Sequence, residues 1–264
     1  MDPVLHVAAA LALFVVAHIG LAFPPVRQAL VARLGVWGFT AAFSVVAWIT
    51  FGFAVSVYVA HAGEGPAGLA LGAHAGARVA LVGVIACGAM LMSGAFAGYT
   101  RSPYAMSGAR VREPRGLERV TRHPFFVGTA LLGGAHVLLA TRLVGAIAMG
   151  SLALLALVGA WFQDRKLLAL RGEPYAAYLA ASSTIPFAAI AAGRQRLVWS
   201  ELPYGMLLLG LALAAVLRAV HGRILDHGGA YLIAAVVIGP LLIFVGEWRR
   251  GQRARRPAST AAVG

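Results

Sequence analysis

Two histidines lie inside long apolar segments of the sequence, where ionisable side chains are uncommon and usually functional. His18 follows Ala17 in a segment without charged residues, and His136 shares a helix face with the small residues Thr129 and Gly133. Two neutral imidazoles on different membrane helices are a common ligand set for six-coordinate b-type haem. The same side chains would also suit hydrogen bonding across helix contacts, so the sequence leaves a haem site and a structural role open.

A second polar group brackets the segment that contains His136. Arg122, His123 and Pro124 come directly before it, and Asp164, Arg165 and Lys166 follow the next apolar segment. Proline fits the first turn of a helix, where its missing N–H costs nothing. Arg122 and His123 would then lie beside a helix N-terminus, which favours anionic groups. An Arg-His pair that only caps the helix is the alternative.

The cysteine content excludes several kinds of site, and the remaining histidines do not indicate a metal site. Cys87 is the only cysteine, so a disulfide within the chain, a CxxC pair, a thiolate zinc site and covalent haem attachment are all ruled out. The other histidines lack close metal-ligand spacing, and we interpret them as surface residues: His6, His61, His74, His221 and His227.

The composition indicates a membrane protein. Of the 264 residues, 60% are hydrophobic and only 12% are charged, against about 45–50% and about 25% in soluble domains. A membrane-spanning helix needs about 20 mainly apolar residues. The sequence therefore predicts an all-α, polytopic transmembrane helical bundle of about seven spans. The expected spans are Val4–Phe23, Trp37–Ala60, Ala77–Gly98, Phe125–Ala140, Leu143–Trp161, Tyr204–Val220 and Gly229–Trp248.

The basic residues predict the orientation of these spans. The net charge is +13. With the N-terminus outside, 18 of the 22 Lys and Arg residues fall in inner segments, and the exceptions are Arg78, Arg142, Arg218 and Arg223. This satisfies the positive-inside rule with the N-terminus out and the C-terminus in. We therefore interpret the basic residues as a topology signal. The expected partner of the protein is the lipid bilayer, and we expect no nucleic-acid partner.

We divide the chain into three parts: residues 1–200 with five spans and their inner loops, residues 201–248 with two further helices, and residues 249–264 as a basic, disordered tail. The inner segments Thr100–Arg122 and Phe162–Pro203 are too long for simple turns. The first span has Asp2 and no basic residue before its apolar run, so we interpret it as an uncleaved anchor. The expected location is a bacterial-type inner (cytoplasmic) membrane.

Several short motifs occur together in a recognisable order. They are Ala17-His18, Arg27 through Gly35, Glu118 through Phe125, Ala135 through Leu139, Asp164-Arg165-Lys166, Pro186 through Ile190, and Gly193-Arg194. Over about residues 5–200 this order resembles the NnrU family of integral membrane proteins, whose relatives include zeta-carotene isomerase. The resemblance does not extend with the same clarity to the last two spans.

The resemblance implies a function. Its isomerase branch implies a b-type haem held by two histidines, matching His18 and His136, and redox-gated isomerisation of a cis double bond in a hydrophobic polyene. Asp164, Arg165 and Lys166 would then anchor the haem propionates or stabilise the inner loop. The NnrU branch implies a role in nitrite and nitric-oxide metabolism (denitrification), without an assigned reaction.

The depths of the two histidines do not agree well. At about 1.5 Å per residue, His18 lies roughly 9 Å above the inner end of its span, and His136 lies roughly 20 Å above His123. Two axial ligands of one iron should be nearly level. His18 and His136 are kept as the first ligand pair, and His123 is the substitute ligand or a supporting group.

A different class of enzyme shares part of this pattern. Arg122-His123-Pro124, Gly172-x-x-Tyr175-x-x-Tyr178 and Ile185-Pro186 resemble membrane methyltransferases of the isoprenylcysteine and phospholipid type, which use S-adenosylmethionine. The chain departs from them at Asp164, where they carry Glu, and at Phe126, where they usually carry Tyr. S-adenosylmethionine-dependent methyl transfer is therefore the alternative, and a non-enzymatic membrane assembly or sensor protein is the third.

Overall fold

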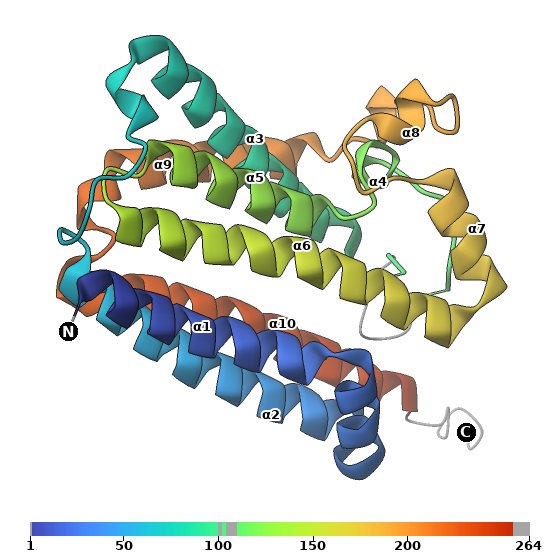
Figure 1. The fold of residues 1–264 in the computed structure, drawn as a ribbon. Coiled ribbons are helices and arrows are strands. Elements are labelled where there is room, and N and C mark those ends of the chain that lie inside the picture. Colours follow the sequence, from blue (N-terminus) through green and yellow to red (C-terminus); the bar gives the residue numbers. More distant parts are fainter. Residues whose placement is uncertain (1, 100–101, 104–109, 256–264) are drawn as a thin grey trace, which may run out of the picture.

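A computed structural model describes residues 2–99, 102–103 and 110–255. The described chain is a bundle of helices that run back and forth along one long axis (Figure 1). Its β-type feature in this part is an isolated bridge between Ala67 and Arg142. The expected all-α class is confirmed.

The first two helices form a hairpin with almost no loop. α1 (Pro3–Ala22) begins at Asp2, whose Oδ1 accepts a hydrogen bond of 2.7 Å from the Val4 backbone N–H. α2 (Pro24–His61) follows after Phe23 alone and bends at Gly35, where φ is +69°. A residue with a side chain is strained at that angle, so glycine permits the bend.

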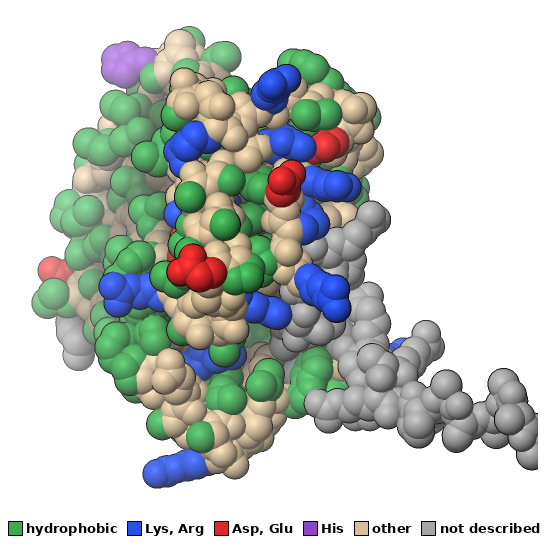
Figure 2. Space-filling model, turned by 90° about the vertical axis from the view of Figure 1, so that its right-hand side faces the viewer, with side chains coloured by type: hydrophobic (Ala, Val, Ile, Leu, Met, Phe, Trp, Pro, Cys, Tyr) green, Lys and Arg blue, Asp and Glu red, His purple; other side chains and the backbone are tan. Residues whose placement is uncertain are grey.

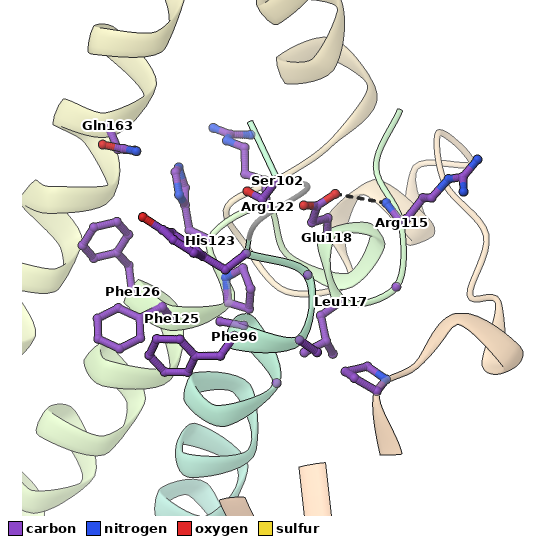
Figure 3. Close-up of a pocket in the computed structure, with 18 of the residues that line it drawn as sticks. Phe96, Ser102, Arg115, Leu117, Glu118, Arg122, His123, Phe125, Phe126 and Gln163 are labelled. Carbon is purple, nitrogen blue, oxygen red and sulfur yellow. Dashed lines mark hydrogen bonds between the residues drawn. The ribbon is translucent and has the colours of Figure 1, made fainter. Parts of the chain in front are cut away.

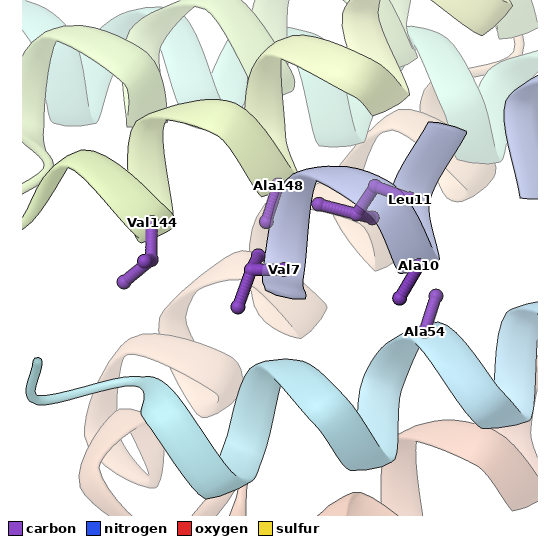
Figure 4. Close-up of a cluster of buried hydrophobic side chains, with 6 residues drawn as sticks. All are labelled: Val7, Ala10, Leu11, Ala54, Val144 and Ala148. Atoms are coloured by element: carbon purple, nitrogen blue, oxygen red, sulfur yellow. The ribbon is translucent and has the colours of Figure 1, made fainter. Parts of the chain in front are cut away.

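A buried cluster joins this hairpin to the longest apolar helix after it, α6 (Leu143–Arg171). Figure 4 shows side chains from α1, α2 and α6 meeting there. The cluster consists of Val7, Ala10, Leu11, Ala54, Val144 and Ala148. Alanines at these positions let the three helices approach closely, as is usual in membrane bundles.

On its other side α6 packs against α5 (Pro124–Leu139), which in turn packs against α3 (Ala75–Gly98). Glycines make these contacts close. A Cβ added at Gly88 would lie 2.7 Å from the Gly128 carbonyl oxygen, and one at Gly133 would lie 2.7 Å from the Met149 carbonyl oxygen. α6 is therefore the central helix, with α1 on one side and α5 on the other (Figure 1).

The last two long helices complete the same bundle. α9 (Tyr204–Ala219) packs against α3, and α10 (Ala230–Arg255) packs against α2. The short helices η1 (Leu71–Ala73), η4 (His221–Arg223) and η5 (Asp226–Gly229) lie in the connections. We expected a disordered tail from residue 249, but α10 continues to Arg255; residues 256–264 of that tail lie outside the described part.

One end of the bundle carries the remaining short elements, and we call it the loop end. It comprises α4 (Leu117–Val120), α7 (Glu173–Ala181), α8 (Ala188–Ala191) and η3 (Trp199–Glu201). Within the segment Phe162–Pro203, α6 ends at Arg171, and the residue after it, Gly172, has a φ of +57° that separates α6 from α7. Of the segment Thr100–Arg122, residues 100–101 and 104–109 lie outside the described residues.

Basic side chains gather over the loop end, as the positive-inside pattern anticipates (Figure 2). Among the described helices, four are long and apolar enough to cross a membrane: α1, α2, α3 and α6. Shorter apolar helices lie at Pro124–Leu139, Tyr204–Ala219 and Asp226–Gly239. A multi-pass membrane protein is thus supported, whereas the count of seven spans and the orientation stay predictions.

The close approach of α3 and α5 gives a matched test. Gly88→Ala places a methyl group against the Gly128 backbone, and we expect it to reduce the free energy of unfolding by about 1–3 kcal/mol through overpacking. Gly83→Ala lies on the same helix with nothing within 4 Å of the added Cβ, so its stability should not fall. Thermal unfolding in detergent measures both, and equal melting temperatures would contradict the close contact.

Candidate functional site

The strongest polar cluster of the loop end forms around Asp164. The His123 Nε2 atom lies 2.8 Å from Asp164 Oδ1, and the His123 side chain is 1% exposed. His123 caps α5 directly before Pro124, whereas Asp164 lies on α6. The contact therefore joins the start of one helix to the last turns of its neighbour.

Two further donors converge on the same carboxylate. The Tyr175 hydroxyl donates to Asp164 Oδ1 at 2.7 Å, and Arg122 donates from Nε to Oδ2 at 3.0 Å. The Arg122 NH2 atom lies 2.9 Å from Oδ2 as well. Tyr175 is fully buried and stacks on Tyr178, with ring centroids 5.5 Å apart. A carboxylate held by His, Arg and Tyr is well neutralised in a partly buried place.

Backbone hydrogen bonds hold the segment before His123 in place. The Arg122 N–H donates to the Ser183 carbonyl at 2.8 Å, and the Phe187 N–H donates to the Val120 carbonyl at 2.8 Å. The hydroxyl of Thr121, which is fully buried, donates to the Thr184 carbonyl at 2.7 Å. The Arg-His-Pro and Ile-Pro-Phe motifs, about 60 residues apart, are thus packed against each other.

A cavity of about 970 Å³ opens beside this cluster. The rings of Phe96, Phe125 and Phe126 lie together on one side of it, and polar groups including Arg122 and Glu118 lie on the other (Figure 3). Phe96 and Phe125 are 44% and 41% exposed, with centroids 5.9 Å apart. The wall consists of the ends of α3, α5 and α6, residues of the segment 112–118 with α4, Ser102, Glu201, Pro203 and two residues of α10.

Ion pairs border the cavity. Arg112 donates to both carboxylate oxygens of Glu118, at 2.8 and 3.2 Å. Burial raises the pKa of Glu118 above its usual value, against the opposing effect of Arg112. Arg119 of α4 donates to both carboxylate oxygens of Glu201, at 2.9 and 3.2 Å. The Arg119 hydrogen bonds, together with one from the Gly116 N–H, lower the pKa of Glu201 to about 2.

The three consecutive residues 164–166 go to three different places. Asp164 forms the cluster, Lys166 lines the cavity, and the Arg165 guanidinium lies 4.7 Å from the Trp161 ring centroid. Asp164 and Lys166 therefore belong to one site with Arg122 and His123, while Arg165 lies over an exposed tryptophan ring.

The predicted haem ligands His18 and His136 are not brought together. The His18 ring packs against Phe43, with centroids 4.6 Å apart, and its buried Nδ1 has no hydrogen-bond partner among the described residues. The His136 Nδ1 lies 2.8 Å from the Leu132 carbonyl, and its ring stacks on His221 at 6.1 Å. α6 lies between the two helices that carry them (Figure 1).

Their depths differ as well. Phe23 contacts Phe162, so His18 is level with about the middle of α6, whereas Gly133 contacts Met149 and Ala153 near the start of α6. At about 1.5 Å per residue this places the two imidazoles roughly 13 Å apart along the bundle axis. The depth difference anticipated from the sequence is present, and the two rings do not fit a common iron in this arrangement.

Some site residues could not be singled out from the sequence. Tyr175 was noted only as part of a spaced motif, and Arg112, Glu201 and Phe96 were not noted as site residues at all. Arg112 pairs with Glu118 across a turn, and Glu201 pairs with Arg119, which lies 82 residues earlier. Neither separation produces a periodic pattern in the sequence. The sequence did contain one indication of such ion pairs, because Glu118 is an acidic residue in a strongly basic segment.

The contact between Arg119 and Glu201 should respond to acid. Because the pKa of Glu201 is held at about 2 instead of the ordinary 4.5, its ionised form stabilises the contact above about pH 4.5, and this contribution is lost as the pH falls toward 2. The emission of Trp199, obtained as the difference from Trp199→Phe, should shift over this range. Glu201→Gln should show the low-pH emission throughout; an unchanged wild-type titration in that variant would contradict the assignment.

Comparison with known proteins identifies the family of this chain. The chain is similar to the 15-cis-zeta-carotene isomerase of Zea mays, 42% identical over 82 residues, and to that of Arabidopsis thaliana, 45% identical over 82 residues. Each match covers about 30% of this chain (31% and 30%) and 22% of the isomerase. No solved structure matches. The family model described as NnrU protein matches residues 6–227, and the chain therefore belongs to the NnrU family.

Proposed function

We propose that this protein is a membrane isomerase that converts a double bond of a long hydrophobic substrate between its cis and trans configurations. The cavity at the loop end would bind part of that substrate. The relatives named as zeta-carotene isomerases support the reaction class. The cavity beside the Asp164 cluster is the observation that carries the location of the site.

The aromatic side of the cavity suits a conjugated chain. Phe96 packs edge-on against Phe125, and Phe125 against Phe126, so the cavity presents both faces and edges of rings. Flat unsaturated groups pack well against aromatic rings at such offsets. A volume of about 970 Å³ lies at the upper end of the range for small-molecule sites, about 300–1,000 Å³. A molecule as long as a carotene would place one part there and extend beyond it.

The Asp164 cluster supplies rigidity at the polar wall. His123 lines the cavity while its Nε2 is held by Asp164, and its ring meets Phe126 edge-on at 5.7 Å. Isomerisation changes the shape of the substrate without adding or removing atoms, so a wall that keeps its form favours one isomer over the other. His123 and Arg122 are therefore positioning residues in this proposal.

The activity of the cavity can be measured directly. We expect the protein in nanodiscs to convert 15-cis-zeta-carotene to its isomer, as followed by chromatography. Phe125→Ala removes the exposed ring from the cavity and should lower kcat/KM about tenfold. Phe53→Ala removes an exposed ring from α2, away from this cavity, and should leave the rate unchanged. Equal rates in both variants would place the reaction elsewhere, and no conversion by the wild type would overturn the isomerase.

A b-type haem is the cofactor that we propose from the resemblance, and His18 and His136 do not fit it as a pair. Because the imidazoles lie at different depths on either side of α6, we expect at most one of them to ligate a haem. In the reduced optical spectrum, only one of His18→Ala and His136→Ala should then have an effect; six-coordinate bands that disappear in both would show that the helices rearrange.

Methyl transfer from S-adenosylmethionine is the second candidate, because the cavity adjoins Arg122-His123-Pro124. Against it, both oxygens of Asp164 already accept from His123, Tyr175 and Arg122, which leaves this carboxylate little capacity for a cofactor. Calorimetric titration with S-adenosylmethionine distinguishes the two. A role in nitrogen-oxide metabolism and a bacterial inner-membrane location stay predictions.

A further inference from the structure

The charged groups around the cavity are almost all paired with each other. Arg112 is matched by Glu118, Arg122 by Asp164, and Glu201 by Arg119. Each pair keeps its charge satisfied within the protein, so none of them requires a ligand. Arg115 also borders the cavity, but its side chain is exposed and points away from it in Figure 3.

Lys166 is different. It lines the cavity and is partly buried, yet within the described residues it has neither a hydrogen bond nor an ion pair. An ammonium group prefers several acceptors, and a partly desolvated one without them is unfavourable. The cavity thus contains one cation that no described protein group neutralises.

A second cation lies close to Lys166 and increases this imbalance. Arg27, near the start of α2, is near enough to repel Lys166 electrostatically. Arg27 is partly buried and lies over the Phe39 ring at 5.4 Å, and among the residues described it too has no carboxylate partner. Two neighbouring cations without an anion raise each other's energy, and an anion bound beside them lowers the energy of both.

The cavity therefore combines an unneutralised cation with an aromatic wall. We propose that its ligand is an anionic amphiphile: an unsaturated chain that lies against Phe96 and Phe125 and ends in a carboxylate or phosphate at Lys166. This rests on the proposed function and specifies its substrate class. A carotene has no charged end and would use only the aromatic part of this cavity, so we expect a polyene with an anionic end to be the better substrate.

A fluorescent polyene acid tests the head group. cis-Parinaric acid carries a carboxylate, and its methyl ester has the same chain without the charge. Binding to the full protein in phosphatidylcholine nanodiscs is read as energy transfer from tryptophan, above that of protein-free nanodiscs. We expect the acid to bind at least tenfold more tightly than the ester, as for hydrogen bonds to charged groups of about 1.5–3 kcal/mol.

Variants of two adjacent residues localise the effect. Lys166→Gln should weaken binding of the acid about tenfold and leave the ester unchanged, and Lys166→Arg should retain the preference for the acid. Arg165→Gln is the matched control, since Arg165 carries the same charge one position away and lies over Trp161; it should bind both probes like the wild type. Melting temperatures confirm that each variant is folded.

Each other outcome has a definite meaning. If acid and ester bind equally well and Lys166→Gln changes neither, the anionic head is wrong while the apolar cavity and the isomerase proposal stand. If neither probe binds above protein-free nanodiscs, the cavity is not the substrate site and both proposals fail. Phosphatidylglycerol added to the nanodiscs separates the sources of the anion: loss of acid binding in proportion to this lipid would assign the position at Lys166 to a lipid head group and overturn the substrate.

Discussion

The loop end of this protein is organised by one negative charge. The Asp164 carboxylate is contacted by Arg122 and His123, which directly precede α5, and by Tyr175 of α7. A partly buried carboxylate is costly unless its partners are close and well directed. Because Arg122 and His123 directly precede α5 and Tyr175 lies on α7, satisfying this one group sets where α5 begins and where α7 packs. The shape of the adjoining cavity follows from these positions.

The cavity itself expresses a conflict between two requirements. A bundle in a membrane gains by packing glycine and alanine contacts tightly, as α3 and α5 do at Gly88 and Gly128. At the loop end the same two helices border the cavity, together with ion pairs and exposed aromatic rings. Packing energy is given up there, which is typical of functional sites, where local consistency yields to binding.

Much of the fold could be predicted from apolar runs, since the helices α1, α3, α5 and α6 follow directly from length and hydropathy. The bend at Gly35 and the extension of α10 to Arg255 could not be predicted. Both lie next to basic residues at the end of an apolar run, where the sequence is compatible with either a helix or a loop. In the site, Arg122, His123 and Asp164 were recognisable as motifs. The partners of Glu118 and Glu201 were not, because contacts across long separations leave no pattern in the sequence. His18 and His136 show the opposite case: each is conspicuous alone, and only depth along the helices separates them.

The hairpin of α1 and α2 has a consequence for how the chain enters the membrane. Phe23 alone separates the two helices, and Pro24 begins the second. The first part of α2, before its bend at Gly35, carries Arg27 and Arg33, and the apolar stretch of α2 follows the bend. In the orientation predicted from the basic residues, this arginine-bearing segment stays on the inner side while the apolar helices on either side of it enter the bilayer together. The orientation of the whole molecule would then be decided in one early event, before the residues that build the cavity have been made.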